Sequence, residues 1–125
     1  MGNIIVAAIE KIIFIPRDFH LLRTKSWNNL VQESGYIQLS NKITENDIAQ
    51  YLRQNPQLIS QWLQWSEDQR CSPAITFEQG ESKRYYVKRY PESEHFKEFN
   101  SMDAFEACAK YIMKQLEDTA NYTNL

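Results

Sequence analysis

The sequence predicts an α+β fold, with helices in the N-terminal half, a β-hairpin or small antiparallel sheet after them, and a C-terminal amphipathic helix. Two observations predict this order. Apolar residues recur every three or four positions up to about residue 68 and again after residue 101, which is helical spacing. Between these stretches, apolar and polar residues alternate on both sides of a turn-forming sequence, as in a hairpin. At 125 residues and 42% hydrophobic composition, the chain is expected to form a single domain, residues 1–125, around one core.

The N-terminal part of the chain contains the most apolar stretch, residues 4–15. It is expected to be a helix or a buried strand, because its apolar residues lie at helical spacing but are largely β-branched. Pro16 is expected to end it. An apolar stripe predicts a second helix over 27–34, with Gly35 as its C-terminal stop. Residues 36–39 are expected to be briefly extended.

Two helices are expected in the middle of the chain. Thr44 has the character of a helix N-cap, and the apolar spacing after it predicts a helix over 45–54. Asn55 and Pro56 then form a new start signal, with Asn as the cap and Pro at the first helical position. The second helix is expected to end near Asp68, and the two helices should share one core.

Alternating apolar and polar residues predict a hairpin, with strands over 74–79 and 84–90 joined by a polar turn. The polar and acidic segment after residue 90 is expected to be a loop with a short strand over 96–99. These features together predict two or three antiparallel strands.

The last helix has the clearest amphipathic pattern in the sequence. Asn100 or Ser101 is expected to cap it, and the tail from Thr119 is expected to fray. Cys108 falls on the apolar face and is interpreted as a core residue. The apolar face is expected to comprise Met102, Phe105, Cys108, Ala109, Ile112, Met113 and Leu116.

The charge and the missing motifs argue against several classes of function. With a net charge of −2, general attraction to nucleic acid is not predicted. Three glycines cannot supply a phosphate-binding loop, and no spacing matches a metal site, so we expect no cofactor and no metal. Residues 4–15 are too short to cross a membrane, which takes roughly 20 apolar residues, and carry no export signal. We therefore expect a cytoplasmic protein.

His20 and His95 are the two histidines of the chain. Such a pair could serve as acid and base in a small ribonuclease, with Lys88 or Lys97 holding the phosphate. Nothing in the sequence fixes the distance between them, and lone histidines are more often surface or packing residues. A small ribonuclease is therefore an alternative function, which predicts RNA cleavage that His→Ala at either position abolishes.

Charges of opposite sign lie in adjacent segments. The hairpin is basic and tyrosine-rich, whereas the segment after it is acidic. The two segments could neutralise each other on a solvated surface, the basic strand could bind single-stranded nucleic acid, or the acidic segment could clamp a basic protein. The cations are Lys83, Arg84, Lys88 and Arg89, and the carboxylates are Glu92, Glu94, Glu98, Asp103 and Glu106.

Two tryptophans lie three residues apart near the end of the second middle helix. Trp62 is interpreted as core, and Trp65 as partly exposed beside Glu67 and Asp68. An aromatic ring next to charges is the composition of a protein-interface hot spot, although core packing is the simpler interpretation.

The aromatic and acidic run Trp62–Arg70, the hairpin residues Tyr85–Val87 and the helix Asp103–Ala109 together resemble small bacterial immunity proteins of contact-dependent growth inhibition systems. The resemblance covers residues 55–117, and the apolar start of the chain departs from it. It implies a cytoplasmic protein that binds the C-terminal domain of a cognate secreted toxin, often a nuclease, and occludes its active site.

Carboxylates would then mimic phosphate in the cationic site of the toxin, while an aromatic ring anchors the contact. No catalytic residue is implied. The partner-binding residues expected on this basis are Trp65, Glu67, Asp68, Tyr86, Glu92, Glu94, Glu98 and Asp103.

Overall fold

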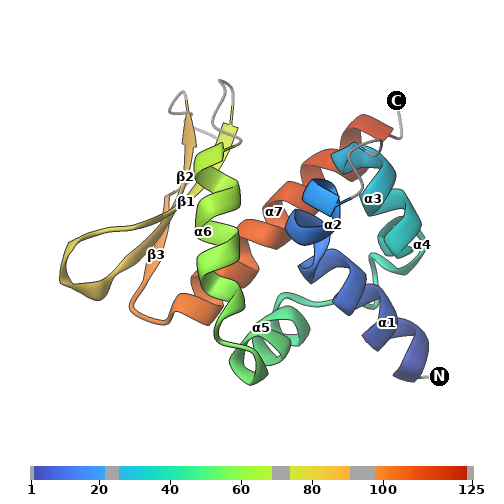
Figure 1. Ribbon diagram of the computed structural model, residues 1–125, viewed down its shortest axis with the longest axis horizontal. Helices are drawn as coiled ribbons and strands as arrows, with labels where there is room; N and C mark the ends of the chain where they lie inside the picture. The colour runs from blue at the N-terminus through green and yellow to red at the C-terminus, as the bar shows by residue number, and fades with distance from the viewer. Residues whose placement is uncertain (1, 22–25, 69–73, 91–97, 124–125) are drawn as a thin grey trace.

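The computed structural model describes residues 2–21, 26–68, 74–90 and 98–123, and its fold is α+β as predicted (Figure 1). The helices of the N-terminal half precede a three-stranded antiparallel sheet and a C-terminal helix. The elements are α1 (Gly2–Ile13), α2 (Ile15–Leu21), α3 (Trp27–Ser34), α4 (Tyr36–Leu39), α5 (Glu45–Gln54), α6 (Leu58–Asp68), β1 (Ala74–Gln79), the 3₁₀ turn η1 (Glu81–Lys83), β2 (Tyr85–Tyr90), β3 (Phe99–Ser101) and α7 (Ala104–Thr123).

The apolar N-terminal stretch is helical. In α1, Ile9, Ile12 and Ile13 are buried at helical spacing, which settles the choice between helix and strand. The helix ends at Ile13, shortly before Pro16, as predicted to within two residues, but the sequence did not predict that a second helix, α2, follows at once. Pro16 lies in the first turn of α2, where its missing N–H costs no helical hydrogen bond, so the helix restarts after Phe14.

A left-handed glycine separates α3 from a further helical turn. Gly35 has φ +84° and ends α3, as predicted. Residues 36–39, however, form α4 and not an extended segment. The buried Ser34 hydroxyl accepts a hydrogen bond from the Tyr36 N–H at 3.2 Å, and Tyr36 itself is buried. This local anchoring explains why the chain turns helical again directly after the glycine.

Thr44 caps α5 as predicted, in a reciprocal pair of hydrogen bonds with Asp47. The prediction for Asn55 is wrong: Asn55 is the C-cap of α5, and its side-chain amide donates to the Tyr51 carbonyl at 3.0 Å. The next helix therefore begins at Leu58 and not at Pro56.

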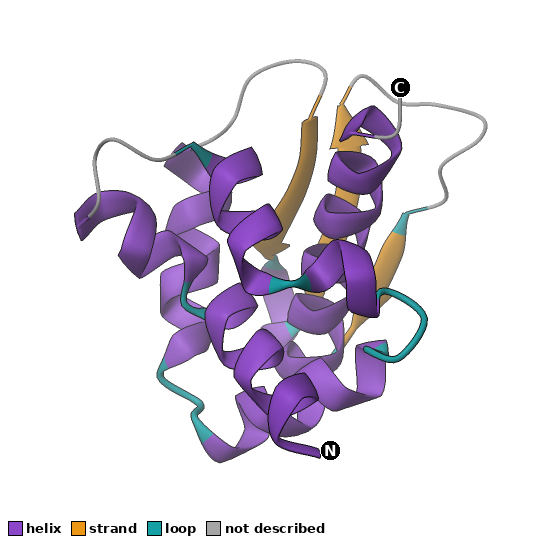
Figure 2. Ribbon diagram, turned by 90° about the vertical axis from the view of Figure 1, so that its right-hand side faces the viewer, coloured by secondary structure: helices purple, strands orange, loops and turns teal. Residues whose placement is uncertain are grey.

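The sheet has the order β1-β2-β3, with both pairs antiparallel. The strands of the hairpin match their prediction to within one residue. The third strand is Phe99–Ser101 and shares only Phe99 with the expected strand over 96–99. Residues 96 and 97 lie outside the described ranges. α7 contacts all three strands and α6 contacts β1, so both helices lie on one side of the sheet (Figures 1 and 2). The inner-face residues are Ile75, Phe77, Tyr85, Val87 and Phe99, and the outer-face residues are Thr76, Glu78, Tyr86, Lys88 and Asn100.

Helix α7 begins later and runs further than expected. Asp103 caps it, in place of Asn100 or Ser101, by accepting hydrogen bonds from the backbone N–H groups of Phe105 at 2.9 Å and Glu106 at 3.3 Å. Met102 therefore lies before the helix and is 65% exposed, so it is not part of the apolar face. The helix extends to residue 123, past the point where fraying was predicted.

Aromatic rings form a continuous chain through the core. Trp65 contacts Phe19 and Trp27 with ring centroids 5.1 and 5.5 Å apart, and Trp62 contacts Trp65 and Tyr111 at 6.4 and 6.1 Å. Tyr111 in turn stacks on Phe77 of β1 at 5.8 Å. Edge-to-face and offset pairs of this kind each contribute about 0.5–1.5 kcal/mol beyond burial. The rings therefore join the helical half of the chain to the sheet.

Candidate functional site

The outer face of the sheet carries a cluster of polar side chains around Lys88. The Lys88 ammonium lies 3.6 Å from a Glu98 carboxylate oxygen and 3.9 Å from one of Glu78. It also lies 4.9 Å from the centroid of the Tyr86 ring, within cation–π distance. The antiparallel register brings these residues together, because Glu78 is directly opposite Tyr86 and Lys88 follows two positions along the same strand.

Gly80 holds the Tyr86 ring in place. A Cβ atom added to Gly80 would overlap the Cε2 atom of Tyr86, so the ring lies directly against the glycine Cα. Tyr86 is thus confined between the backbone of the hairpin turn and the Lys88 ammonium. A partly exposed aromatic ring fixed in this way loses little conformational freedom when a partner covers it. The sequence pattern did not reveal this role for Gly80.

Glu78 and Glu98 are paired with Lys88 on this face and do not form the expected acidic clamp. Glu98 and Glu78 both face the Lys88 ammonium. This pairing favours mutual neutralisation of the basic and acidic segments among the described residues. The expected contact residues Glu92 and Glu94 lie outside the described ranges.

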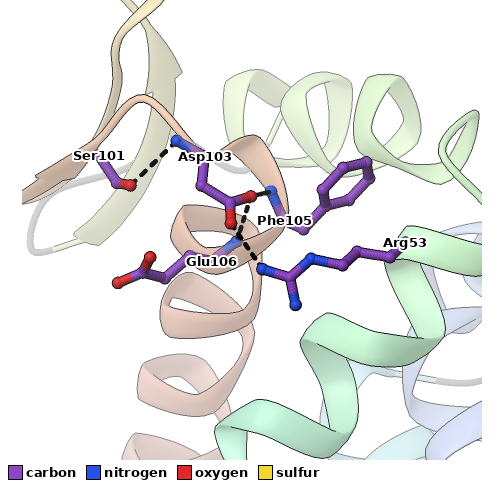
Figure 3. Close-up of polar contacts among 5 residues, drawn as sticks. All are labelled: Arg53, Ser101, Asp103, Phe105 and Glu106. Carbon is purple, nitrogen blue, oxygen red and sulfur yellow. Dashed lines mark hydrogen bonds and ion pairs between the residues drawn. The ribbon is translucent and has the colours of Figure 1, made fainter.

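Asp103 is occupied by contacts within the chain (Figure 3). Besides capping α7, its carboxylate accepts a 2.6 Å hydrogen bond from the Arg53 guanidinium of α5. Partial burial alone would raise the pKa of Asp103, but the hydrogen bonds from Arg53 and two backbone N–H groups outweigh it and hold the pKa below its usual value. This aspartate therefore ties α5 to the start of α7, and these contacts leave less of the carboxylate for a partner than the sequence suggested.

Trp65 is buried, and the prediction that it is partly exposed is wrong. Only 4% of its surface is exposed, because Phe19 and Trp27 cover the ring. Glu67, two residues further along α6, is exposed. Asp68 is the last residue of α6, but its side chain lies outside the described part of the structure. Sequence spacing alone could not show which helices cover Trp65.

The residues of the ribonuclease alternative are not brought together by the described structure. His20 lies in α2 with its side chain outside the description, and His95 lies outside the described ranges. Cys108 is fully buried, and burial raises the pKa of its thiol well above the usual value, so it is a core residue as predicted. Among the described residues, no group of three or more His, Cys, Asp or Glu side chains could hold a metal ion.

A side-chain hydrogen bond links the end of the hairpin turn to β3. The guanidinium of Arg84, which directly precedes β2, donates a 2.7 Å hydrogen bond to the side-chain carbonyl of Asn100. Neither residue stood out as a pair in the sequence, because their contact depends on the register of the third strand.

Comparisons with protein-family models, curated proteins and solved structures give no match to this chain. None of the helices in the described ranges is both long enough and apolar enough to span a membrane.

Proposed function

We propose that the chain is a cytoplasmic immunity protein that binds the C-terminal domain of a cognate bacterial toxin and blocks its active site. The observation that carries the proposal is Tyr86, an aromatic ring held between Gly80 and Lys88 on the outer face of the sheet. Interface hot spots are typically aromatic residues surrounded by polar groups that exclude water. Among the described helices, α6 and α7 lie on the other side of the sheet, and on the outer face Tyr86 and Lys88 are half-buried whereas Thr76 of β1 is fully buried (Figure 1).

The mechanism is occlusion. Tyr86 would be covered by the toxin, while Glu98 and Glu78 would exchange part of their pairing with Lys88 for cations of the toxin site. A nuclease site is cationic because it holds phosphates, so carboxylates are suitable occupants. Because both carboxylates already face Lys88 before binding, recognition would depend on the arrangement of these charges more than on net charge.

The test is capture of the partner followed by protection from it. The tagged full-length chain is expected to retain the C-terminal domain of a secreted toxin, identified by mass, and to rescue growth of cells that express this domain. Tyr86→Ala is expected to weaken binding at least tenfold, because hot-spot aromatics typically contribute 2 kcal/mol or more, about 30-fold in affinity. Tyr86→Phe keeps the ring and should retain most of the affinity.

A matched pair of charge reversals tests whether binding depends on the charge at the sheet face or only on the net charge of the protein. Glu98→Lys should weaken binding, whereas Glu117→Lys on α7 makes the same change in net charge away from the sheet face and should not. Equal affinity of both variants, together with no effect of Tyr86→Ala, would contradict this surface as the contact. Failure to retain or neutralise any toxin domain would contradict the function itself.

A further inference from the structure

The β1 edge of the sheet is closed by side chains of two helices. The Phe77 N–H donates to the Ser66 hydroxyl of α6 at 2.7 Å, and the Ile75 carbonyl accepts a hydrogen bond from the Gln115 side chain of α7 at 3.2 Å. These are the backbone groups that point away from β2. A further strand therefore cannot pair with β1 at these positions.

β3 forms the opposite edge of the sheet, and its outward backbone groups have no partner among the described residues (Figure 2). Because the Phe77 N–H points away from β2, the antiparallel ladder alternates so that Val87 is hydrogen-bonded to Phe99. Asn100 consequently turns its N–H and C=O outward. No described residue donates to or accepts from these two groups, so this edge is a template for another strand.

The outer face of this edge carries one positive and one negative charge. Glu98, Asn100 and Met102 lie at alternate positions of the segment, and all three are exposed. The Arg84 guanidinium donates to the Asn100 side chain and has no described carboxylate within ion-pair distance. A complementary strand must therefore present an anion near Arg84 and accommodate Glu98 at the other end.

We propose that the β3 edge pairs with the β3 edge of a second copy of this chain, which joins the two sheets into one antiparallel sheet across a two-fold axis at Asn100. The two Asn100 residues would form a hydrogen-bonded pair, in which the N–H of each donates to the C=O of the other. In this register, Glu98 lies opposite Met102 of the second copy. The dimer does not depend on the proposed function.

Charge complementarity selects the second copy. Arg84 lies beside Asn100, and Glu98 of the second copy is the diagonal neighbour of Asn100 on the same face. Diagonal positions on neighbouring strands are about 7–8 Å apart, within reach of long side chains. Each guanidinium thus gains the carboxylate that it lacks within its own chain, and the two-fold axis makes the contact twice.

The same register keeps like charges apart. The two Arg84 residues lie on the β2 side of each sheet, so three strand spacings, roughly 14 Å, separate them across the axis. The neutral Asn100 side chains meet at the axis itself. Met102, which is 65% exposed in one chain, would lose apolar surface to water by lying against the second copy.

The first test compares Asn100→Pro with Asn100→Ala in the full-length chain. Both remove the side-chain hydrogen bond with Arg84, but only proline removes the outward N–H, and it breaks no backbone bond between β2 and β3. Sedimentation equilibrium of the unmodified chain should show a dimer that forms with increasing concentration. Asn100→Pro should weaken this dimer about tenfold or more relative to Asn100→Ala, and near-UV circular dichroism checks that both variants are folded.

The second test exchanges the two charges between copies. Arg84→Glu places two carboxylates at each contact, and Glu98→Arg places two guanidinium groups there, so each variant alone should dimerise about five- to tenfold more weakly. An equal mixture of the two variants restores both ion pairs and should dimerise as tightly as the unmodified chain. Lys83→Glu, the same charge change as Arg84→Glu but at the exposed hairpin tip, should leave the dimer unchanged.

Three results would overturn the inference. A chain that stays monomeric at all concentrations has no such dimer, and a dimer that Asn100→Pro leaves intact uses another surface. A mixture of the charge variants that dimerises no better than either alone would contradict this register. Because Glu98 also belongs to the proposed toxin contact, Tyr86→Ala separates the two claims: it should weaken toxin binding and leave the dimer unchanged.

Discussion

Tyr86 and Gly80 lie directly against each other on the outer sheet face. Gly80 has φ −100°, which any residue can adopt, so alanine at this position is not strained in its backbone. The glycine is required only because the Tyr86 ring lies against it. Any effect of a Cβ atom there must therefore act through the ring.

Gly80→Ala is accordingly expected to lower the free energy of unfolding by about 1–2 kcal/mol, the cost of displacing a packed ring. In a Tyr86→Ala background, the same change should cost almost nothing. Urea unfolding of the four proteins measures this coupling. Equal costs in both backgrounds would show that Gly80 does not hold the ring.

Thr76 is a polar residue of β1 that is buried without a hydrogen bond to offset the loss of water. It is fully buried, and its hydroxyl has no hydrogen-bond partner. Thr76→Val keeps the shape and removes the unsatisfied group, so it should raise the free energy of unfolding by about 1 kcal/mol. Denaturant titration checks this value, and Thr76→Ser, which keeps the hydroxyl, should show no gain.

Asp103 links stability to pH. Its pKa is lowered in the folded state, so its contribution is complete above the unfolded pKa of about 3.9 and is lost as the pH falls through the folded value. Asp103→Asn can still cap α7 but has no charge for Arg53. Stability measured by urea titration between about pH 6 and pH 2 should therefore depend less steeply on pH in the variant. An unchanged slope would contradict the ion pair.

At the scale of elements, the hairpin turn stores strain in two ordinary residues. Ser82 and Lys83 both have φ +60°, and the Arg84 N–H donates to the Glu81 carbonyl across them at 3.3 Å. These are the torsions of a type I′ turn, for which Asn-Gly is the preferred sequence.

Ser82→Asn combined with Lys83→Gly is expected to raise the free energy of unfolding by about 1 kcal/mol, because both residues tolerate positive φ. Thermal unfolding gives the measurement. Ser82→Val combined with Lys83→Val, which suits neither position, should destabilise the hairpin instead.

Sequence patterns predicted most elements but misplaced several ends. Thr44 and Gly35 were correct because a cap and a left-handed glycine act through local backbone geometry. Asn55 was misread because asparagine is compatible with both ends of a helix, and tertiary packing decides which end forms.

At the scale of the whole molecule, the aromatic rings join both parts of the fold. Because Trp62 and Tyr111 connect the helices to Phe77 of the sheet, we expect one cooperative unfolding transition, consistent with a single domain. Tryptophan fluorescence and far-UV circular dichroism should give coincident curves. Two separate midpoints would show that the helical half and the sheet unfold independently.

The candidate site was only partly predictable from the sequence. Tyr86 and Glu98 lie on one face, as the alternating strand pattern allows. Trp65, in contrast, is covered by rings from α2 and α3, and Asp103 is bound by Arg53 of α5. Contacts between residues 40 or 50 positions apart leave no periodic signal in the chain. The pairing of Arg84 with Asn100 could not be predicted either, because it depends on the register of β3.

The closed edge at β1 sets a limit on how large an assembly can become. Head-to-tail growth of a sheet into a filament needs two unpaired edges on every subunit, and here Ser66 and Gln115 occupy the backbone groups of one of them. Sheet-to-sheet growth through β1 is therefore blocked in the described part of the chain, and an assembly of copies cannot extend through this edge.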